Sequence, residues 1–295
     1  MRRGVLVMAY GTPERLEDVA SYYTHIRRGS PPPPDLLDGL LSRYEAVGGP
    51  TALNRTTRAQ ADGIARSLSR RGHHVPVHIG FKHVPPFVGE TVARMAAEGI
   101  ERAVGLVLAP HYSLRSIAEY ERYAEEARPR GLALDVIRSW HDDAGLVAYL
   151  AGRLRDALAR SEGASRVVFT AHSVPVAPAG DDPYAAQLRE TSELVAKSAE
   201  VEDWEFAFQS AGRTADCWLG PDVLESIDAI AKRGYHGVVV QAIGFVADHL
   251  ETLYDLDVEA RRAAESRGLA FTRAAMPNDD PAFVEVLARI VEARL

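Results

Sequence analysis

The chain has 295 residues, of which 46% are hydrophobic and 25% are charged, and its formal net charge is −7. This composition is typical of a folded globular protein, and the length is sufficient for two domains of ordinary size. Acidic and basic residues are interspersed, so the chain lacks the basic excess that would favour nucleic acid as its main partner.

Two further classes of protein are disfavoured. No apolar run is long enough for a transmembrane segment, and residues 1–10 do not have the form of a signal peptide. The single cysteine, Cys217, excludes an internal disulfide and an iron–sulfur cluster held by cysteines of one chain. We therefore expect a cytoplasmic protein.

Strand-like and helix-like segments alternate along the chain. Short apolar runs rich in β-branched residues predict strands at Val5–Ala9, Val75–Gly80, Ala103–Ala109, Ala133–Ile137, Arg166–Ala171, Trp204–Gln209, Gly237–Ile243 and Leu269–Arg273. Amphipathic segments predict helices at Arg58–Ser69, Pro86–Ala97, Ile117–Ala127, Gly145–Ala159, Tyr184–Ser198 and Val223–Lys232.

This alternation predicts an α/β protein with parallel sheets and right-handed crossovers. Four strands fall in each half, so we expect two similar Rossmann-like domains with a cleft between them, each a four-stranded parallel sheet flanked by helices. The predicted boundary gives an N-terminal domain at residues 1–143 and a C-terminal domain at 144–295, with the last helix free to pack back on the N-terminal domain.

One segment of the chain is repeated with a change of chemistry. Val5–Pro13 aligns without a gap on Val167–Pro175, so Tyr10 and His172 occupy the same position, each at the end of a predicted strand. A second pair, residues 104–120 and 237–253, repeats in the same order. Ligands of open α/β sheets bind outside the carboxyl ends of strands. We therefore expect Tyr10 and His172 on opposite walls of one cleft.

The region after the seventh predicted strand is rich in carboxylates. If the segment after Gly244 is an α-helix, then Glu251, Asp255 and Glu259 lie on one face, at i, i+4 and i+8. Repulsion in such a ladder costs a few tenths of a kcal/mol per pair, roughly, and no lysine or arginine lies in that stretch. The ladder is either a solvated acidic face or, beside His172, part of a site that handles a divalent cation and protons.

Nucleotide sites find no support, because no Gly-x-Gly-x-x-Gly or Gly-x4-Gly-Lys-Ser/Thr pattern follows a predicted strand. The chain instead resembles the ferrochelatase family, and is most similar to the bacterial coproporphyrin III ferrochelatases. The matching stretches are Val7–Pro13, Tyr22–Gly29, Arg43–Gly49, Lys82–His83, Leu108–Ser113, Ala171–Pro175, Gly180–Gln187, Trp218–Asp222 and Gly244–Asp257.

The resemblance implies a chelatase-like fold and a lyase that inserts Fe(II), as substrate, into coproporphyrin III during haem biosynthesis. It implies that His172 and Glu251 handle the metal and the pyrrole protons. From the ladder itself we expect Asp255 and Glu259, behind Glu251, to relay cations or protons to the surface. The resemblance implies that Tyr10 contacts or ligates iron from the opposite face. The porphyrin-contacting positions that it implies are Arg27, Arg43, Tyr44, Thr51 and Tyr120.

The resemblance also leaves alternatives open. A protoporphyrin IX ferrochelatase differs only in substrate, and a sirohydrochlorin-type cobaltochelatase would show further histidine ligands, for which His111 is a candidate. A non-catalytic haem or porphyrin carrier would keep Tyr10 but has no need of both His172 and Glu251. We expect a monomer that meets neighbouring enzymes of haem synthesis only transiently.

Overall fold

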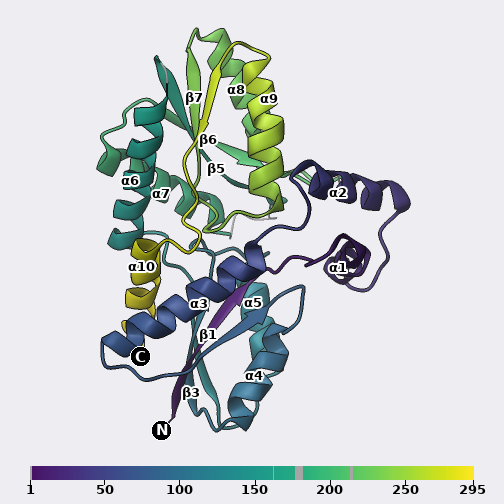
Figure 1. Ribbon diagram of the computed structural model, residues 1–295, viewed down its shortest axis with the longest axis vertical. Helices are drawn as coiled ribbons and strands as arrows, with labels where there is room; N and C mark the ends of the chain where they lie inside the picture. Colours follow the sequence, from purple (N-terminus) through teal and green to yellow (C-terminus); the bar gives the residue numbers. More distant parts are fainter. Residues whose placement is uncertain (1, 162, 177–181, 213–214) are drawn as a thin grey trace. The chain divides into compact units, whose positions relative to one another are not determined.

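The computed structural model describes residues 2–161, 163–176, 182–212 and 215–295 (Figure 1). Its strands form two parallel four-stranded sheets of order β2-β1-β3-β4 and β6-β5-β7-β8. The strands are β1 (Arg3–Ala9), β2 (Val77–Phe81), β3 (Arg102–Val107), β4 (Ala133–Ile137), β5 (Ser165–His172), β6 (Trp204–Gln209), β7 (Gly237–Ala242) and β8 (Ala270–Arg273). The predicted fold class and all eight predicted strands are confirmed, with ends shifted by up to two residues.

The helices are η1 (Leu16–Asp18), α1 (Val19–Ile26), α2 (Pro34–Ala46), α3 (Leu53–Arg70), α4 (Val88–Ala97), α5 (Ile117–Glu126), α6 (Ala144–Arg160), α7 (Tyr184–Ala199), α8 (Val223–Lys232), η3 (Thr252–Ala260), α9 (Arg261–Glu265) and α10 (Pro281–Glu292). All six predicted helices are present. Part of the Gly180–Gln187 stretch lies outside the described residues. In the part of the chain that the structure describes, no helix combines the length and apolarity needed to cross a membrane.

The central strand of each sheet is made mainly of hydrophobic residues that are buried on both faces of the sheet. In β1, Val5–Met8 are fully buried, and β1 pairs with β2 on one side and β3 on the other. In the second sheet, β5 occupies the matching central place between β6 and β7. Continuous apolar runs of this kind are typical of parallel strands enclosed by helices. The identical strand order bears out the duplication seen in the sequence.

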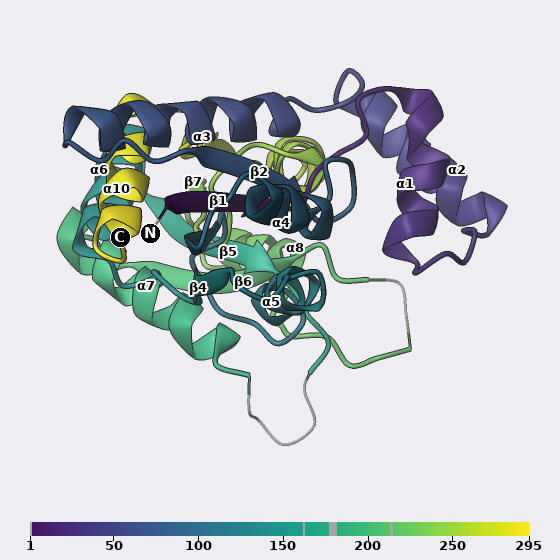
Figure 2. The same cartoon turned by 90° about the horizontal axis from the view of Figure 1, so that it is seen from below.

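The internal contacts divide the chain into two compact units. The first contains the residues up to Trp140 together with Ala247–His249 and Pro277–Leu295, and the second contains His141–Val246 and Leu250–Met276. The C-terminal helix α10 therefore groups with the first sheet and not with the second. Within the first unit, α1 and α2 lie together and stand away from the sheet in both views (Figures 1 and 2).

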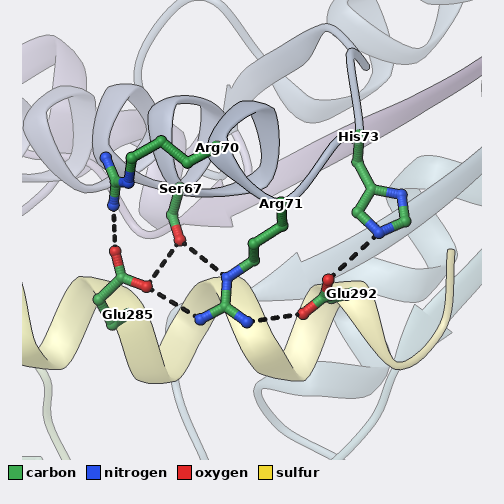
Figure 3. A network of polar contacts seen from close by, with 6 residues as sticks. All are labelled: Ser67, Arg70, Arg71, His73, Glu285 and Glu292. Atoms are coloured by element: carbon green, nitrogen blue, oxygen red, sulfur yellow. Dashed lines mark hydrogen bonds and ion pairs between the residues drawn. The ribbon is translucent and has the colours of Figure 1, made fainter.

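Helix α10 is held beside α3 by a polar network (Figure 3). Arg71 joins two carboxylates of α10, with Nη2 at 3.0 Å from Glu285 Oε2 and Nη1 at 3.0 Å from Glu292 Oε2. The Ser67 hydroxyl donates to Glu285 Oε2 at 2.8 Å. This hydrogen bond, outweighing the opposing effect of burial, and the two neighbouring arginines lower the pKa of Glu285. The network also includes Arg70 and His73.

Candidate functional site

The strand order of the second sheet defines where its ligand site should lie. In the parallel sheet of order β6-β5-β7-β8, β6 is added on one side of β5, and β7 and β8 are added on the other side. Ligands of open α/β sheets bind outside the carboxyl ends of the strands at such a switch point, here between β5 and β7. His172 is the last residue of β5, and Glu251 follows β7. The two side chains meet, with His172 Nε2 at 3.3 Å from Glu251 Oε1.

The Glu251 carboxylate favours the protonated form of His172. Burial disfavours the imidazolium, but the Glu251 carboxylate outweighs it, with help from the Ser173 carbonyl and Asp255, and raises the pKa of His172 to about 9. Nδ1 of the ring is hydrogen-bonded to the Ser173 carbonyl. The bond at Nδ1 orients the ring, and the other ring nitrogen, Nε2, faces Glu251.

Neighbouring elements hold the histidine in place. The Tyr184 hydroxyl, from α7, donates to the His172 carbonyl at 3.1 Å. Burial and the Glu251 carboxylate raise the pKa of Tyr184, so it stays a neutral donor. Gly244, between β7 and Glu251, lies so close to β5 that a Cβ there would come within 2.5 Å of the Ala171 Cβ. A glycine is therefore needed where the chain leaves β7.

Glu251 is fixed through its backbone. Gln209, at the end of β6, is completely buried and donates from Nε2 to the Glu251 carbonyl at 3.3 Å. The Thr170 hydroxyl, in β5, donates in turn to Gln209 Oε1 at 2.9 Å. The amide oxygen and the amide nitrogen of Gln209 are thus both hydrogen-bonded, and this fixes the orientation of the side chain. The glutamine was not among the residues predicted for the site.

The acidic segment is helical and Glu251 lies at the start of the helix, as the sequence analysis requires, but most of the segment is not an α-helix. Helix begins only at Leu250, and residues Thr252–Ala260 form the π-helix η3. In a π-helix each N–H bonds five residues back and a turn takes between four and five residues, so residues four apart still lie near one face. Extended π-helices are rare, and they occur often at functional sites.

The carboxylates of this segment have different surroundings. Asp255 is only 5% exposed and accepts a hydrogen bond from the Ser210 hydroxyl, so a solvated acidic face is the wrong interpretation for it. Asp257 is paired by two hydrogen bonds of 2.8 Å with Arg273, a residue of β8. The positive charge that offsets this acidic segment therefore belongs to Arg273 in β8, so the sequence of the segment alone does not reveal it. Glu259 lies at an intermediate depth.

Tyr10 follows β1, the strand of the first sheet that corresponds to β5. It is 42% exposed, and its ring lies 4.5 Å from the ring of His83 and 5.7 Å from Lys82 Nζ. Burial, with Lys82 next in effect, lowers the pKa of His83 to about 3, so this histidine is neutral. His25 contributes a further ring contact, with its Nδ1 at 3.1 Å from His83 Nδ1.

Lys82 is buried, and its charge is paired with a carboxylate that the sequence analysis did not identify. Its Nζ lies 2.5 Å from Glu119 Oε2, and Arg28 Nη2 lies 3.1 Å from Glu119 Oε1. Burial raises the pKa of Glu119, but the two cations outweigh it and leave the pKa lowered. The ammonium also lies 5.2 Å from the ring centroid of Tyr120. The pairing joins a residue of α5 to two loops, so only the folded chain reveals it.

The five predicted porphyrin contacts all belong to the first unit: Arg27, Arg43, Tyr44, Thr51 and Tyr120. Tyr44 and Tyr120 are 1% and 3% exposed, and the Tyr44 hydroxyl lies 3.1 Å from Thr12 Oγ1. Arg27 follows α1 and its guanidinium lies 6.0 Å from the Tyr23 ring centroid. Their role in binding stays a prediction.

The predicted metal ligands fall in both units. His172, Glu251, Asp255 and Glu259 belong to the second unit and Tyr10 to the first. No set of three or more histidine, cysteine, aspartate or glutamate side chains is arranged to hold a metal ion among the residues described. Among the predicted ligands of the second unit, His172 and Glu251 are in direct contact.

Comparisons with known proteins agree with these features. The sequence model described as Ferrochelatase matches residues 2–295. Coproporphyrin III ferrochelatases of Bacillus pumilus and Bacillus subtilis are each 40% identical, with 100% of this chain and 97% and 98% of theirs covered. A ferrochelatase of Thermus thermophilus is 43% identical over 98% of each chain.

Solved structures support the fold. SirB from Bacillus subtilis, in a structure with Fe³⁺, is 12% identical, with a TM-score of 0.61 and 99% of this chain and 95% of that chain covered. CbiX, described as the terminal enzyme of sirohaem biosynthesis in denitrifying bacteria, is 14% identical, with a TM-score of 0.58 and 99% and 100% covered. These similarities concern the fold alone.

Proposed function

The chain belongs to the ferrochelatase family, and we propose that it inserts ferrous iron into coproporphyrin III to form Fe-coproporphyrin III in haem biosynthesis. The observation that carries the proposal is the pair formed by His172 and Glu251 at the β5 and β7 ends. Full-length relatives of about the same size, named for this reaction, support the substrate. The proposal includes a cytoplasmic location and a monomeric enzyme.

The reaction exchanges one Fe²⁺ for two pyrrole protons, which leave to solvent. In the metal-free protein the pair of His172 and Glu251 shares a proton, because the carboxylate holds the imidazolium. An arriving cation displaces that proton and is bound by imidazole and carboxylate, ligands that suit a borderline divalent ion. When the cation passes to the porphyrin, the vacated pair accepts one pyrrole proton, which the next cation displaces, and the other pyrrole proton is lost to solvent.

Further residues supply binding and delivery in this proposal. Asp255 and Glu259 extend the acidic path behind Glu251 toward the surface. Tyr10 contacts the iron on the other face of the ring. The side chains of Arg27 and Arg43 bind propionates, because a guanidinium matches a carboxylate in geometry and charge. Tyr44, Thr51 and Tyr120 complete the porphyrin contacts.

The decisive experiment is anaerobic Fe(II) insertion followed by absorbance, with coproporphyrin III and protoporphyrin IX offered separately to the purified protein. We expect faster turnover of coproporphyrin III. Preferred turnover of protoporphyrin IX would keep the chelatase and overturn the substrate. Tight porphyrin binding without metal insertion into either would favour a carrier and contradict the roles given to His172 and Glu251.

A further inference from the structure

A three-residue segment just before Glu251 belongs to a different unit from its neighbours. The chain is part of the second unit as far as Val246, joins the first unit for Ala247–His249, and returns to the second at Leu250. Ala247 and Leu250 are buried. Glu251 is therefore the second residue after this excursion.

The anchor is the side chain of Asn278. Its Oδ1 accepts the backbone N–H of Asp248 at 2.8 Å, and its Nδ2 donates to Asp248 Oδ2 at 2.8 Å. Two bonds between the same two residues restrain both the position and the orientation of Asp248. One of the two is charge-assisted, because the acceptor is a carboxylate.

Asn278 is itself held by its backbone. It has a φ of +48° in a turn closed by the bond from Asp280 N to the Pro277 carbonyl at 3.1 Å. Asparagine adopts this left-handed conformation more readily than most residues. The Asn278 carbonyl also accepts a 2.7 Å hydrogen bond from Nε2 of Gln60, a completely buried residue of α3. The anchor therefore rests on a long, rigid helix.

We propose that Asn278 is a positioning residue for metal insertion, which fixes the approach to Glu251 by anchoring the excursion at Asp248 to α3. This inference deepens the proposed function and rests on it. Asn278 acts through the segment that it holds, since its side chain is bonded to Asp248. A displacement of about 1 Å in a reacting group can cost about a hundredfold in rate.

The test uses Asn278→Gly, because glycine keeps the positive φ and removes only the amide. We expect kcat for iron insertion to fall about tenfold, with the porphyrin Kd changed by less than about twofold. Hydrogen exchange measured by mass spectrometry should become about tenfold faster over residues 247–256, because two hydrogen bonds are lost. Asn278→Asp, which removes the Nδ2 donor and sets two carboxylates together, should show the same pattern.

The matched control is Glu285→Gln, which removes the ion pairs of Glu285 with Arg70 and Arg71 between α10 and α3 in the same unit. We expect it to speed exchange in α3 and α10 while kcat stays within about twofold of the wild type. Unchanged exchange over residues 247–256 in Asn278→Gly, or a loss of activity matched by the loss of folded protein, would overturn the inference. A wild-type protein without chelatase activity would overturn the proposed function instead, and the exchange data would still judge the anchor.

Discussion

The two sheets share one strand order but surround the corresponding residue with opposite chemistry. At the end of β5, His172 faces the carboxylate of Glu251, with Asp255 nearby. At the end of β1, Tyr10 lies against a neutral histidine and a buried lysine. The same scaffold thus offers an acidic, proton-holding site in one half and a cationic, aromatic site in the other.

This difference indicates how a duplicated fold divides a reaction. A divalent cation is attracted to carboxylates and repelled by an ammonium, which supports the proposal that the second sheet handles the metal. A substrate rich in carboxylates is attracted to guanidinium groups, the role proposed for Arg27 and Arg43 of the first unit, whereas Lys82 is already paired with Glu119. The backbone fixes where the side chains stand, and the choice of side chain fixes which reactant each half receives.

The largest effect is expected at His172, the centre of the acidic site. His172→Ala should lower the rate of iron insertion by about a hundredfold to ten-thousandfold, because it removes both a metal ligand and a proton acceptor. Binding of coproporphyrin III, followed by fluorescence quenching, should be nearly unchanged. A variant that turns over at the wild-type rate would remove the imidazole from the mechanism and erase the contrast between the two sheets.

Glu251→Gln should have the next largest effect. We expect a loss of about 10- to 100-fold in insertion. The pKa of His172 should fall from about 9, because burial, which lowers it, would no longer be outweighed by the carboxylate. The imidazole would then be neutral at pH 7. Its titration can be followed by NMR of the ring protons, and a midpoint that stays near 9 would show that another group holds the charge.

A smaller effect is expected at the corresponding residue of the first sheet. Tyr10→Phe should change the absorption spectrum of the bound iron product, because the phenol oxygen is the group proposed to meet the iron. The ring is 42% exposed, so the thermal stability should change little. An identical product spectrum in the wild type and the variant would mean that Tyr10 does not ligate the metal.

Much of this arrangement could be predicted from the sequence, because the relevant signals are local. Apolar runs specify strands, and the alignment of Val5–Pro13 with Val167–Pro175 correctly predicts two equivalent central strands. The positions of Tyr10 and His172 at strand ends follow from the same alignment. The contact of His172 with Glu251 could be expected because His172 ends β5 and Glu251 follows β7, the neighbour of β5 in the sheet.

What could not be predicted depends on partners distant in the sequence. Asp257 and Arg273 are 16 residues apart, and Lys82 and Glu119 come from a loop and a helix that meet only in the folded chain. The π-helix also could not be predicted from the spacing of the carboxylates, because residues four apart lie near one face in both an α-helix and a π-helix. The segment is nonetheless pinned by Arg273 and Ser210, contacts that no local periodicity contains.

The smallest expected effect lies away from both strand ends, at Glu285 in the network between α3 and α10. The pKa of Glu285 is lowered in the folded protein, so the carboxylate adds stability above its unfolded pKa and loses that contribution as the pH falls through the folded pKa. Glu285→Gln should therefore lower the unfolding free energy near pH 7 by about 0.5–1 kcal/mol, since the side chain is 37% exposed and the pairs are partly screened. The difference from the wild type should shrink in acid, below about pH 4. Urea denaturation at several pH values measures it, and a difference that does not depend on pH would assign the contribution of Glu285 to packing rather than to charge.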